Sequence, residues 1–448
     1  MTITSTTARD ATASGSTAPT VALCGVEFGW GSAGKLGAVI DALRARLGDD
    51  IRFVGIGSRL GRDVVRGYGV TQWHDVDVAD RRALRALVEE QSIDVALCVL
   101  DRATAVGLEE AGCPVVFVDS LPFLWTEEDL AGLPLRAAVY CAQLCPGLPG
   151  PAWPVMARVE NLRWVESVVV PAPARPERDV RPPGLRRAVV SLGGLLSPLL
   201  DDPSEYLSLV VPAALRALAA WGVTQVTLCG NLSAPLPDGL RDAAPQGMEV
   251  RGGALGHQGF LEAVAEADAL LASPGLTTLL ESSTRGVPVV CLPPQNISQI
   301  LNATFYAQAS GAPTAAWPDS VFRAQDVLDA RLGDGGPTND ADTGTAIDTG
   351  IGTGTGTNTG TNTEQDNGGS PGEDAALELI YGGISRAAAD PEPVRAALTA
   401  RIGTCLAAVE AHAGHWTALA RLVGTGGAAQ VADAVLATAR AGSARTSL

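Results

Sequence analysis

The sequence predicts an α/β protein with two domains, each a parallel sheet covered by helices, followed by C-terminal helices. Three observations support this fold class. Continuous Val/Ile/Leu-rich runs alternate with amphipathic stretches, as expected for strands that are buried on both faces. The alternation occurs twice, and each half opens with an apolar strand that leads into a Gly-rich turn. A Pro-rich stretch, residues 171–183, separates the halves. Two Rossmann-like domains of this kind face each other across a ligand cleft at the carboxyl ends of their strands.

The elements of each half follow from hydrophobic periodicity. In the first half we expect strands at 21–25, 51–56, 95–99 and 114–118, with helices at about 35–47 and 79–91. In the second half we expect strands at 187–192, 225–229, 249–250, 269–272 and 287–292, with helices at 206–220, at 259–267 and after Gly275.

The predicted domain layout has six parts. These are a disordered tail (1–19), an N-terminal Rossmann-like domain on the acceptor side (20–170), a linker (171–186), a C-terminal Rossmann-like domain (187–332), a disordered acidic Gly/Thr-rich insertion (333–374) and a C-terminal helical segment (375–448). The insertion has too few apolar residues to offset the entropy of ordering it. We treat it as a tolerated insertion without a role of its own.

The charge balance limits the classes of partner. The chain has 32 basic and 49 acidic residues, a net charge of −17, and Lys35 is its one lysine. Nucleic acids and anionic membranes attract clustered Lys and Arg, so we expect neither as a partner. No signal peptide or membrane span is apparent, and we expect a cytoplasmic protein. The eight cysteines, including Cys141 and Cys145, have no zinc-site spacing, so we expect structural cysteines and no metal site.

The most informative segment is 273–302, SPGLTTLLESSTRGVPVVCLPPQNISQILN. A strand ends at Ser273, Gly275 turns the chain, and a helix begins with Leu276, Thr277 and Thr278. The free N–H groups and positive dipole of such a helix start suit a diphosphate. Glu281 lies one turn further along the same face, where its carboxylate could accept both hydroxyls of a ribose. After the next strand, Gln295, Asn296 and Gln299 offer amides to sugar hydroxyls. The alternative is a capped helix with a surface Glu and a polar loop.

This segment resembles the donor site of GT-B glycosyltransferases, in particular those of the peptidoglycan N-acetylglucosaminyltransferase type. The shared features are the Gly-Leu-Thr helix start, the Glu, the Gly-x-Pro strand and the Pro-x-Gln turn; SLGG at 191–194 matches the loop after the first C-domain strand. The resemblance implies a UDP-sugar as substrate rather than a cofactor. It implies that Glu281 binds the ribose, that the helix start at Gly275–Thr278 faces the phosphates, and that Gln295 and Gln299 approach the sugar. Gly193, Gly194 and Ser273 are expected to be donor-binding residues as well.

The Gly-rich loop of the first half, GWGSAGKLG (29–37), departs from that family, which usually has a His beside the glycines. It also mimics a Walker A loop, but Leu36 cannot ligate Mg²⁺ as Ser or Thr would. We expect Gly31 and Ser32 to approach the donor. Glu27 is the candidate for acceptor recognition or proton removal, and Lys35 for a phosphate or carboxylate contact. The alternative for Lys35 is a solvated lysine at a helix start.

The string VALCGVEFGWGSAGKL (21–36) is also similar to cytosylglucuronate synthases, glycosyltransferases of peptidyl-nucleoside antibiotic pathways. This resemblance implies UDP-glucuronate as donor and cytosine, or a hydroxymethyl form, as acceptor. Glu27 could then pair with the amino side of cytosine, and Lys35 or an arginine could hold the glucuronate carboxylate.

Other hypotheses stay open. A UDP-sugar epimerase or hydrolase, or a non-catalytic UDP-sugar binder, would share the fold. His257 could contact the donor, whereas His74 is expected on a surface loop and His412 and His415 in structural positions on helices. The aromatic residues of 119–125 (DSLPFLW) could stack on a planar acceptor or pack in the core. The sequence leaves the stereochemistry and oligomeric state open.

Overall fold

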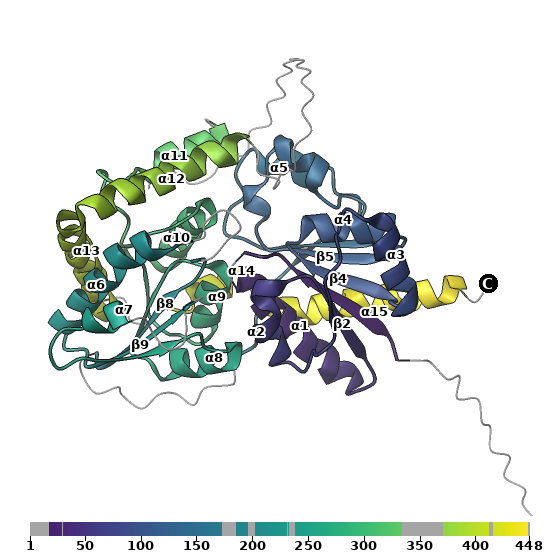
Figure 1. Ribbon diagram of the computed structural model, residues 1–448, viewed down its shortest axis with the longest axis horizontal. Helices are drawn as coiled ribbons and strands as arrows, with labels where there is room; N and C mark the ends of the chain where they lie inside the picture. Colours follow the sequence, from purple (N-terminus) through teal and green to yellow (C-terminus); the bar gives the residue numbers. More distant parts are fainter. Residues whose placement is uncertain are drawn as a thin grey trace, which may run out of the picture.

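The computed structural model contains two α/β domains, each with an entirely parallel sheet, and this confirms the predicted fold class (Figure 1). The structure describes residues 18–28, 30–172, 185–195, 202–230, 232, 238–333, 371–411 and 415–446. The predicted tail, most of the predicted linker, residues 334–370 of the insertion, and His412 lie outside these ranges. The domain boundaries therefore stay a prediction.

The first sheet has the strand order β3-β2-β1-β4-β5-β6-β7. Its strands are β1 (Thr20–Gly25), β2 (Arg52–Ile56), β3 (Trp73–His74), β4 (Val95–Val99), β5 (Val115–Asp119), β6 (Val139–Gln143) and β7 (Leu162–Val165). The longer helices around it are α1 (Gly31–Leu47), α3 (Arg81–Glu90) and α4 (Arg102–Glu110), and the short ones are η1 (Arg59–Gly61), α2 (Arg62–Arg66), η2 (Pro122–Leu124), η3 (Glu127–Gly132) and α5 (Ala152–Met156). The three strands β1, β4 and β5 consist of buried residues throughout because hydrophobic clusters form on both faces of the sheet.

The second sheet has the order β10-β9-β8-β11-β12. Its strands are β8 (Arg187–Leu192), β9 (Gln225–Gly230), β10 (Glu249–Gly253), β11 (Ala269–Ala272) and β12 (Val289–Cys291). Helices α6 (Ser204–Ala220), α7 (Asp238–Asp242), α8 (His257–Glu266), α9 (Leu276–Thr284), α10 (Ile297–Ser310) and α11 (Ala324–Leu332) surround it. One large hydrophobic cluster fills this domain and includes Phe123 from the first domain, which packs edge-on against Phe305 at a centroid distance of 5.1 Å.

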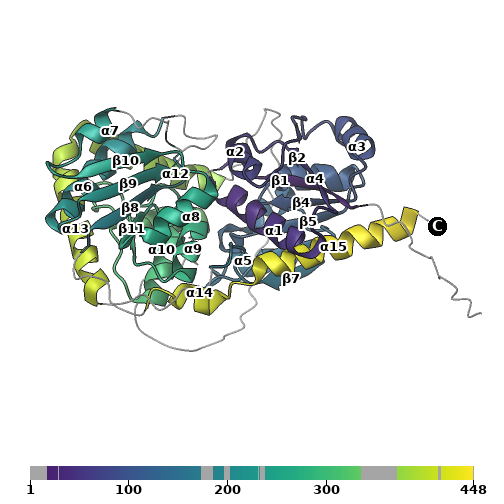
Figure 2. The ribbon, with the colours of Figure 1, turned by 90° about the horizontal axis from the view of Figure 1, so that it is seen from below.

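The C-terminal helices connect the two domains. Helices α12 (Pro371–Ala389), α13 (Pro391–Ala411) and α14 (Ala418–Val423) pack on the second domain, but α15 (Gly427–Thr446) returns to the first domain and lies along α1 (Figure 2). The Glu166 carboxylate fixes this crossing because it accepts hydrogen bonds from the N–H groups of Thr425 and Gly426, at 2.8 and 2.6 Å. Among the described residues, no helix is long and apolar enough to cross a membrane.

Three sequence expectations require correction. Residues 371–374 belong to α12 rather than to a disordered insertion, since Pro371 opens the helix and Glu373 and Asp374 suit its positive end. His74 lies in the short edge strand β3, not in a loop. His415 is exposed between α13 and α14 rather than on a helix.

Candidate functional site

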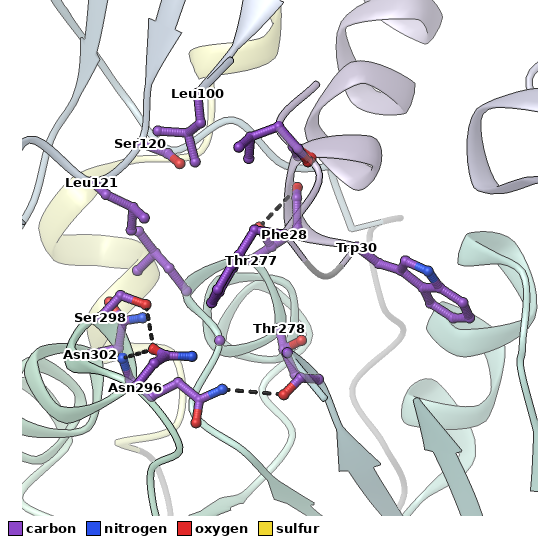
Figure 3. A pocket seen from close by; sticks show the side chains of 18 of the residues that line it. Phe28, Trp30, Leu100, Ser120, Leu121, Thr277, Thr278, Asn296, Ser298 and Asn302 are labelled. Atoms are coloured by element: carbon purple, nitrogen blue, oxygen red, sulfur yellow. Dashed lines mark hydrogen bonds between the residues drawn. The ribbon is translucent and has the colours of Figure 1, made fainter. Parts of the chain in front are cut away.

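The strand orders of both sheets point to one place for a ligand. In the first sheet, β2 and β3 are added on one side of β1 and the later strands on the other, so the strand order reverses between β1 and β4. In the second sheet the strand order reverses in the same way between β8 and β11. Open parallel sheets bind ligands at such switch points, outside the carboxyl ends of the strands. Residues that follow all four of these strands line a single cavity between the domains, among them Val26, Leu100, Gly193 and Gly275 (Figure 3).

The start of α9 lines the cavity on the second-domain side. Gly275 precedes the helix and supplies no capping side chain, and Leu276, Thr277 and Thr278 all line the cavity. The N–H groups of a first turn have no partner inside the helix and carry its positive dipole end. Glu281 also lines the cavity and is 2% exposed. The structure therefore brings together the helix start and the carboxylate that the sequence analysis selected.

The predicted amides form the wall beside this helix. The side-chain amides of Gln295 and Gln299 each donate to the carbonyl oxygen of Gly193, at 3.2 Å, and therefore hold the turn after β8. Gly194 has a φ of +75°, and a Cβ there would lie 3.0 Å from the Gln299 amide nitrogen, so this close approach needs a glycine. Gln299 lines the cavity, whereas Gln295 and Ser273 bond to each other behind the lining.

Lys35 of the first domain contacts the start of α9 in the second domain. The residue lies on α1, within the helix rather than in a loop, and it is 2% exposed, which excludes a solvated lysine. Its Nζ donates to the hydroxyl of Thr277, which also lies 3.4 Å from the carbonyl oxygen of Gly31. Burial lowers the pKa of Lys35 to about 8, while the nearby Glu281 carboxylate opposes this shift. Gly31, Ser32 and Lys35 all line the cavity, and their contact with a donor stays a prediction.

A second contact between the domains involves a residue that the sequence analysis missed. The Tyr68 hydroxyl lies 2.7 Å from Nδ1 of His257, and Nε2 of His257 lies 2.6 Å from Glu281 Oε1. Burial and the nearby carboxylates of Asp41 and Glu281 raise the pKa of Tyr68, so its hydroxyl stays protonated beside His257. His257, the weaker candidate in the sequence, therefore orients Glu281. Nothing in the sequence around Tyr68 indicates this role, since its partner lies far away in the chain.

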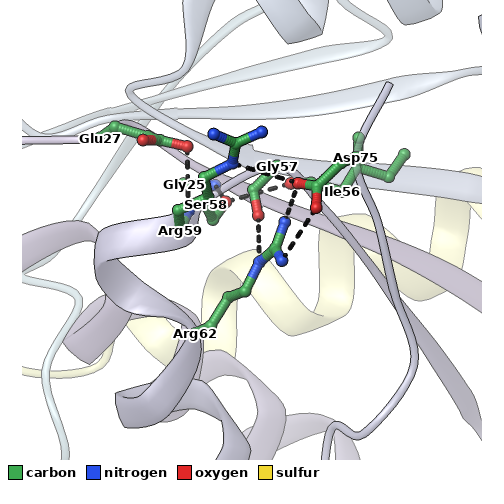
Figure 4. A network of polar contacts seen from close by, with 8 residues as sticks. All are labelled: Gly25, Glu27, Ile56, Gly57, Ser58, Arg59, Arg62 and Asp75. Atoms are coloured by element: carbon green, nitrogen blue, oxygen red, sulfur yellow. Dashed lines mark hydrogen bonds and ion pairs between the residues drawn. The ribbon is translucent and has the colours of Figure 1, made fainter. Parts of the chain in front are cut away.

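Glu27, the predicted base, does not line the cavity. Its carboxylate accepts a hydrogen bond of 2.9 Å from the backbone N–H of Arg59, beside the ion pair of Arg62 and Asp75 (Figure 4). Its neighbours Val26 and Phe28 do line the cavity. His74 also lies outside the lining, where it contacts Gln72.

Aromatic and aliphatic side chains form the first-domain wall. Phe28, Trp30, Leu100 and Leu121 face the cavity (Figure 3). In the 119–125 segment, Trp125 lines the cavity and Phe123 packs in the core, and stacking on a planar acceptor stays a prediction. Asp119, at the end of β5, is fully buried and accepts hydrogen bonds from Trp125 Nε1, the Tyr140 hydroxyl and the Leu121 N–H, at 2.6, 2.8 and 2.9 Å. Burial raises its pKa to about 6, although these three donors oppose the shift.

We expect Asp119→Asn to loosen this wall. The asparagine amide would direct its own N–H groups at Leu121 or at Trp125 and Tyr140, and a buried donor that loses its acceptor costs about 1–3 kcal/mol. The variant should therefore unfold at a lower temperature in calorimetry. Tyr140→Phe is the control, since it removes one donor and leaves the carboxylate bonded to the other two. An Asp119→Asn variant with the wild-type melting temperature would contradict this role.

One comparison with known proteins assigns this chain to a family. A profile of the family described as CGA synthase-related protein matches residues 72–332, more than half of the chain. The chain belongs to the CGA synthase-related family. The matched segment includes Asp119, His257 and Glu281, whereas Glu27 and Lys35 precede it. No curated protein matches the sequence.

Solved structures with related folds have low sequence identity. MurG from Acinetobacter baumannii aligns at 14% identity over 94% of this chain and 99% of its own, with a TM-score of 0.48. The spinosyn rhamnosyltransferase SpnG aligns at 14% identity over 94% of this chain and 98% of its own, also at 0.48. The UDP-GlcNAc 2-epimerase from Neisseria meningitidis aligns at 10% identity over 61% of this chain and 82% of its own, at 0.40.

Proposed function

We propose that this protein is a glycosyltransferase that moves a sugar from a UDP-sugar to a small-molecule acceptor. The observation that carries the proposal is the uncapped start of α9, with the buried Lys35 opposite it and Glu281 one turn along. These groups match the parts of a ribose diphosphate: N–H groups and an ammonium for the phosphates, and a carboxylate for the ribose hydroxyls. Because they supply positive charge at the leaving group, we propose transfer without a metal ion.

The finer proposal is that glucuronate moves from UDP-glucuronate to cytosine or a hydroxymethyl form of it. It is supported by the family description, whose abbreviation fits cytosylglucuronate, and by the resemblance in residues 21–36. The apolar and aromatic wall of Phe28, Trp30 and Trp125 suits a flat heterocycle.

In the proposed reaction a ring nitrogen of the acceptor attacks the anomeric carbon of the sugar. The bond from this carbon to the β-phosphate oxygen breaks, and its electron pair stays on UDP. The added negative charge then develops beside Lys35 and the start of α9, where it is stabilised. The ring N–H proton passes to a base, and we propose Glu27 for this step. Its carboxylate would have to turn from the Arg59 N–H towards the cavity, past Val26 and Phe28.

A panel of UDP-sugars crossed with nucleobase acceptors, analysed by mass spectrometry, tests the proposal. We expect a nucleoside whose mass equals acceptor plus glucuronate minus water, formed with UDP-glucuronate and cytosine. Reactions without an acceptor are the control: UDP release or sugar isomerisation there would indicate a hydrolase or an epimerase. UDP binding with no product from any pair would indicate a non-catalytic binder.

UDP affinity should depend on pH through Lys35. The protonated ammonium attracts the diphosphate, and the pKa of Lys35 is about 8, so it is mostly charged at pH 7 and mostly neutral at pH 9. The affinity should therefore be nearly constant below pH 7.5 and fall by up to about tenfold per unit above pH 8. Calorimetric titrations from pH 6.5 to 9.5 measure this effect. In a Lys35→Met variant the UDP affinity should no longer fall above pH 8. An identical fall in the wild type and the variant would mean that another group causes it.

A further inference from the structure

The cavity contains an arginine that the proposed chemistry does not use. Arg102 is the first residue of α4, directly after the N-cap Asp101 and close to the end of β4. Its position is therefore at the switch point of the first sheet, and its side chain, 24% exposed, lines the cavity.

Two side chains hold the guanidinium of Arg102 in place. It lies over the ring of Trp125, with 4.9 Å from its central carbon to the ring centroid, and Nη1 lies 3.5 Å from Asp129 Oδ1. Asp119 in turn fixes the Trp125 ring by the 2.6 Å hydrogen bond to its Nε1. The plane of the guanidinium is thus oriented before any ligand arrives.

The carboxylate of Asp129, which pairs with Arg102, already accepts hydrogen bonds from other groups. Asp129 is 5% exposed, and its Oδ2 accepts hydrogen bonds from Arg331 at 2.7 Å, the Thr126 N–H at 2.9 Å and the Thr126 hydroxyl at 3.2 Å. Within the described ranges, the guanidinium of Arg102 donates no hydrogen bond to the protein, and only the 3.5 Å ion pair joins it to Asp129. An arginine has five N–H donors, and a partly buried cation is costly when its donors lack acceptors.

The two cations Lys35 and Arg102 of the cavity lining differ in their contacts. At the α9 end, the ammonium of Lys35 donates to Thr277 and lies near Glu281. At the α4 end, the carboxylates of Asp129 and Glu373 lie near Arg102, but its guanidinium donates no hydrogen bond within the described ranges. A planar guanidinium with two parallel N–H groups matches the geometry of a carboxylate.

We propose that Arg102 is a specificity-determining residue that binds a carboxylate carried by the substrate. This rests on the proposed function only in that the ligand is one of the two reactants in the cavity. The carboxylate belongs either to the transferred sugar, as in a uronate, or to the acceptor. Trp125 sets the plane of the guanidinium, and Asp129 balances part of its charge.

The first experiment compares UDP-glucuronate with UDP-glucose, which differs from it only at C6 of the sugar. We expect Arg102→Met to weaken binding of UDP-glucuronate by about 10–100-fold, the range for lost charge-assisted hydrogen bonds. Binding of UDP-glucose should change by less than about twofold. Calorimetry measures both affinities, and kcat/KM for the two donors is the parallel readout. Methionine keeps an apolar chain over Trp125, and Arg331 still pairs with Asp129, so we expect the variant to fold.

Arg136→Met is the matched control, because Arg136 is an exposed arginine, paired with Glu160 at 3.6 Å, that does not line the cavity. A second arm compares cytosine with 5-carboxycytosine as acceptor. Loss of selectivity in the donor pair assigns the carboxylate to the sugar, and loss in the acceptor pair assigns it to the acceptor. An equal change with charged and neutral ligands in both arms, or no change, would overturn the proposal.

A third measurement separates this proposal from the proposed function. Ligand-observed NMR with free glucuronate, free glucose and free 5-carboxycytosine needs neither UDP binding nor turnover. If no UDP-sugar binds but a free carboxylate does, and Arg102→Met abolishes that signal, the Arg102 site stands while the proposed function fails. If UDP-sugars bind and the carboxylate makes no difference in any arm, the Arg102 site fails while the proposed function stands.

Discussion

Replacing Glu281 by alanine is expected to weaken UDP binding by about 100-fold or more while the protein stays folded. The carboxylate is 2% exposed at the bottom of the cavity, and His257 fixes it at 2.6 Å. In the proposed complex it accepts both ribose hydroxyls, and each charge-assisted hydrogen bond contributes about 1.5–3 kcal/mol. The loss should raise the donor KM and the calorimetric Kd together. It should also lower the pKa of Lys35 further, since Glu281 is the charge that opposes its desolvation.

Two variants make this result specific. Glu281→Gln keeps the volume and one acceptor oxygen, so its UDP affinity should fall between those of the wild type and the alanine variant. Glu262→Ala removes an exposed carboxylate from the neighbouring helix α8 and should leave the affinity unchanged. Wild-type UDP affinity in Glu281→Ala would mean that the ribose binds elsewhere.

Replacing Lys35 by methionine is expected to lower kcat by about 100–1000-fold, the usual cost of removing one preorganised charge that faces a developing anion. The ammonium contacts Thr277 at the start of α9, where the leaving diphosphate is expected. Ground-state binding of the UDP-sugar should weaken much less than kcat, because the charge on the β-phosphate increases only as the sugar departs.

The melting temperature distinguishes a loss of catalysis in Lys35→Met from misfolding. Lys35 is 2% exposed, so its desolvation opposes folding, and methionine of similar length should leave the melting temperature equal or higher. Lys35→Arg should not restore activity, because the larger guanidinium would have to fit where the Lys35 side chain is 2% exposed and already contacts Thr277. A methionine variant with wild-type kcat would remove Lys35 from the mechanism.

The sequence predicted the second-domain half of the site well because its signals are local. The strand end at Ser273, the Gly275 turn and Glu281 lie within one supersecondary unit, so periodicity alone places the helix start and the carboxylate on one face. The same holds for the Gly193–Gly194 turn. Gln295 lies behind the lining, where its amide donates to the Gly193 carbonyl and the Ser273 hydroxyl, and these partners lie far from it in the sequence.

Long-range contacts account for what sequence reasoning missed. Tyr68 reaches His257, and Arg331 reaches Asp129, only because the two domains pack face to face. The expectation that Glu27 would meet the ligand followed from its place after β1, but the orientation of its side chain depends on η1, whose N–H groups offer it a partner. Likewise, no local pattern shows that α15 crosses back to the first domain, since this depends on Glu166 and the chain at 425–426.

The overall acidity of the chain says little about the cavity. The net charge is −17, and residues 333–374 hold eight acidic residues and no basic one. The cavity lining nevertheless contains Lys35, Arg102 and Arg331 beside Glu281 and Glu373, and it includes the positive end of α9. The net charge of the chain therefore does not set the local charge that a doubly negative nucleotide-sugar would meet in the cavity.

A crystal structure with UDP bound tests the central claim most directly. We predict that the diphosphate contacts the N–H groups at the start of α9 and the ammonium of Lys35, and that the ribose hydroxyls bond to Glu281. UDP bound on the outer surface of either domain, or in the cavity with its ribose away from Glu281, would contradict the account.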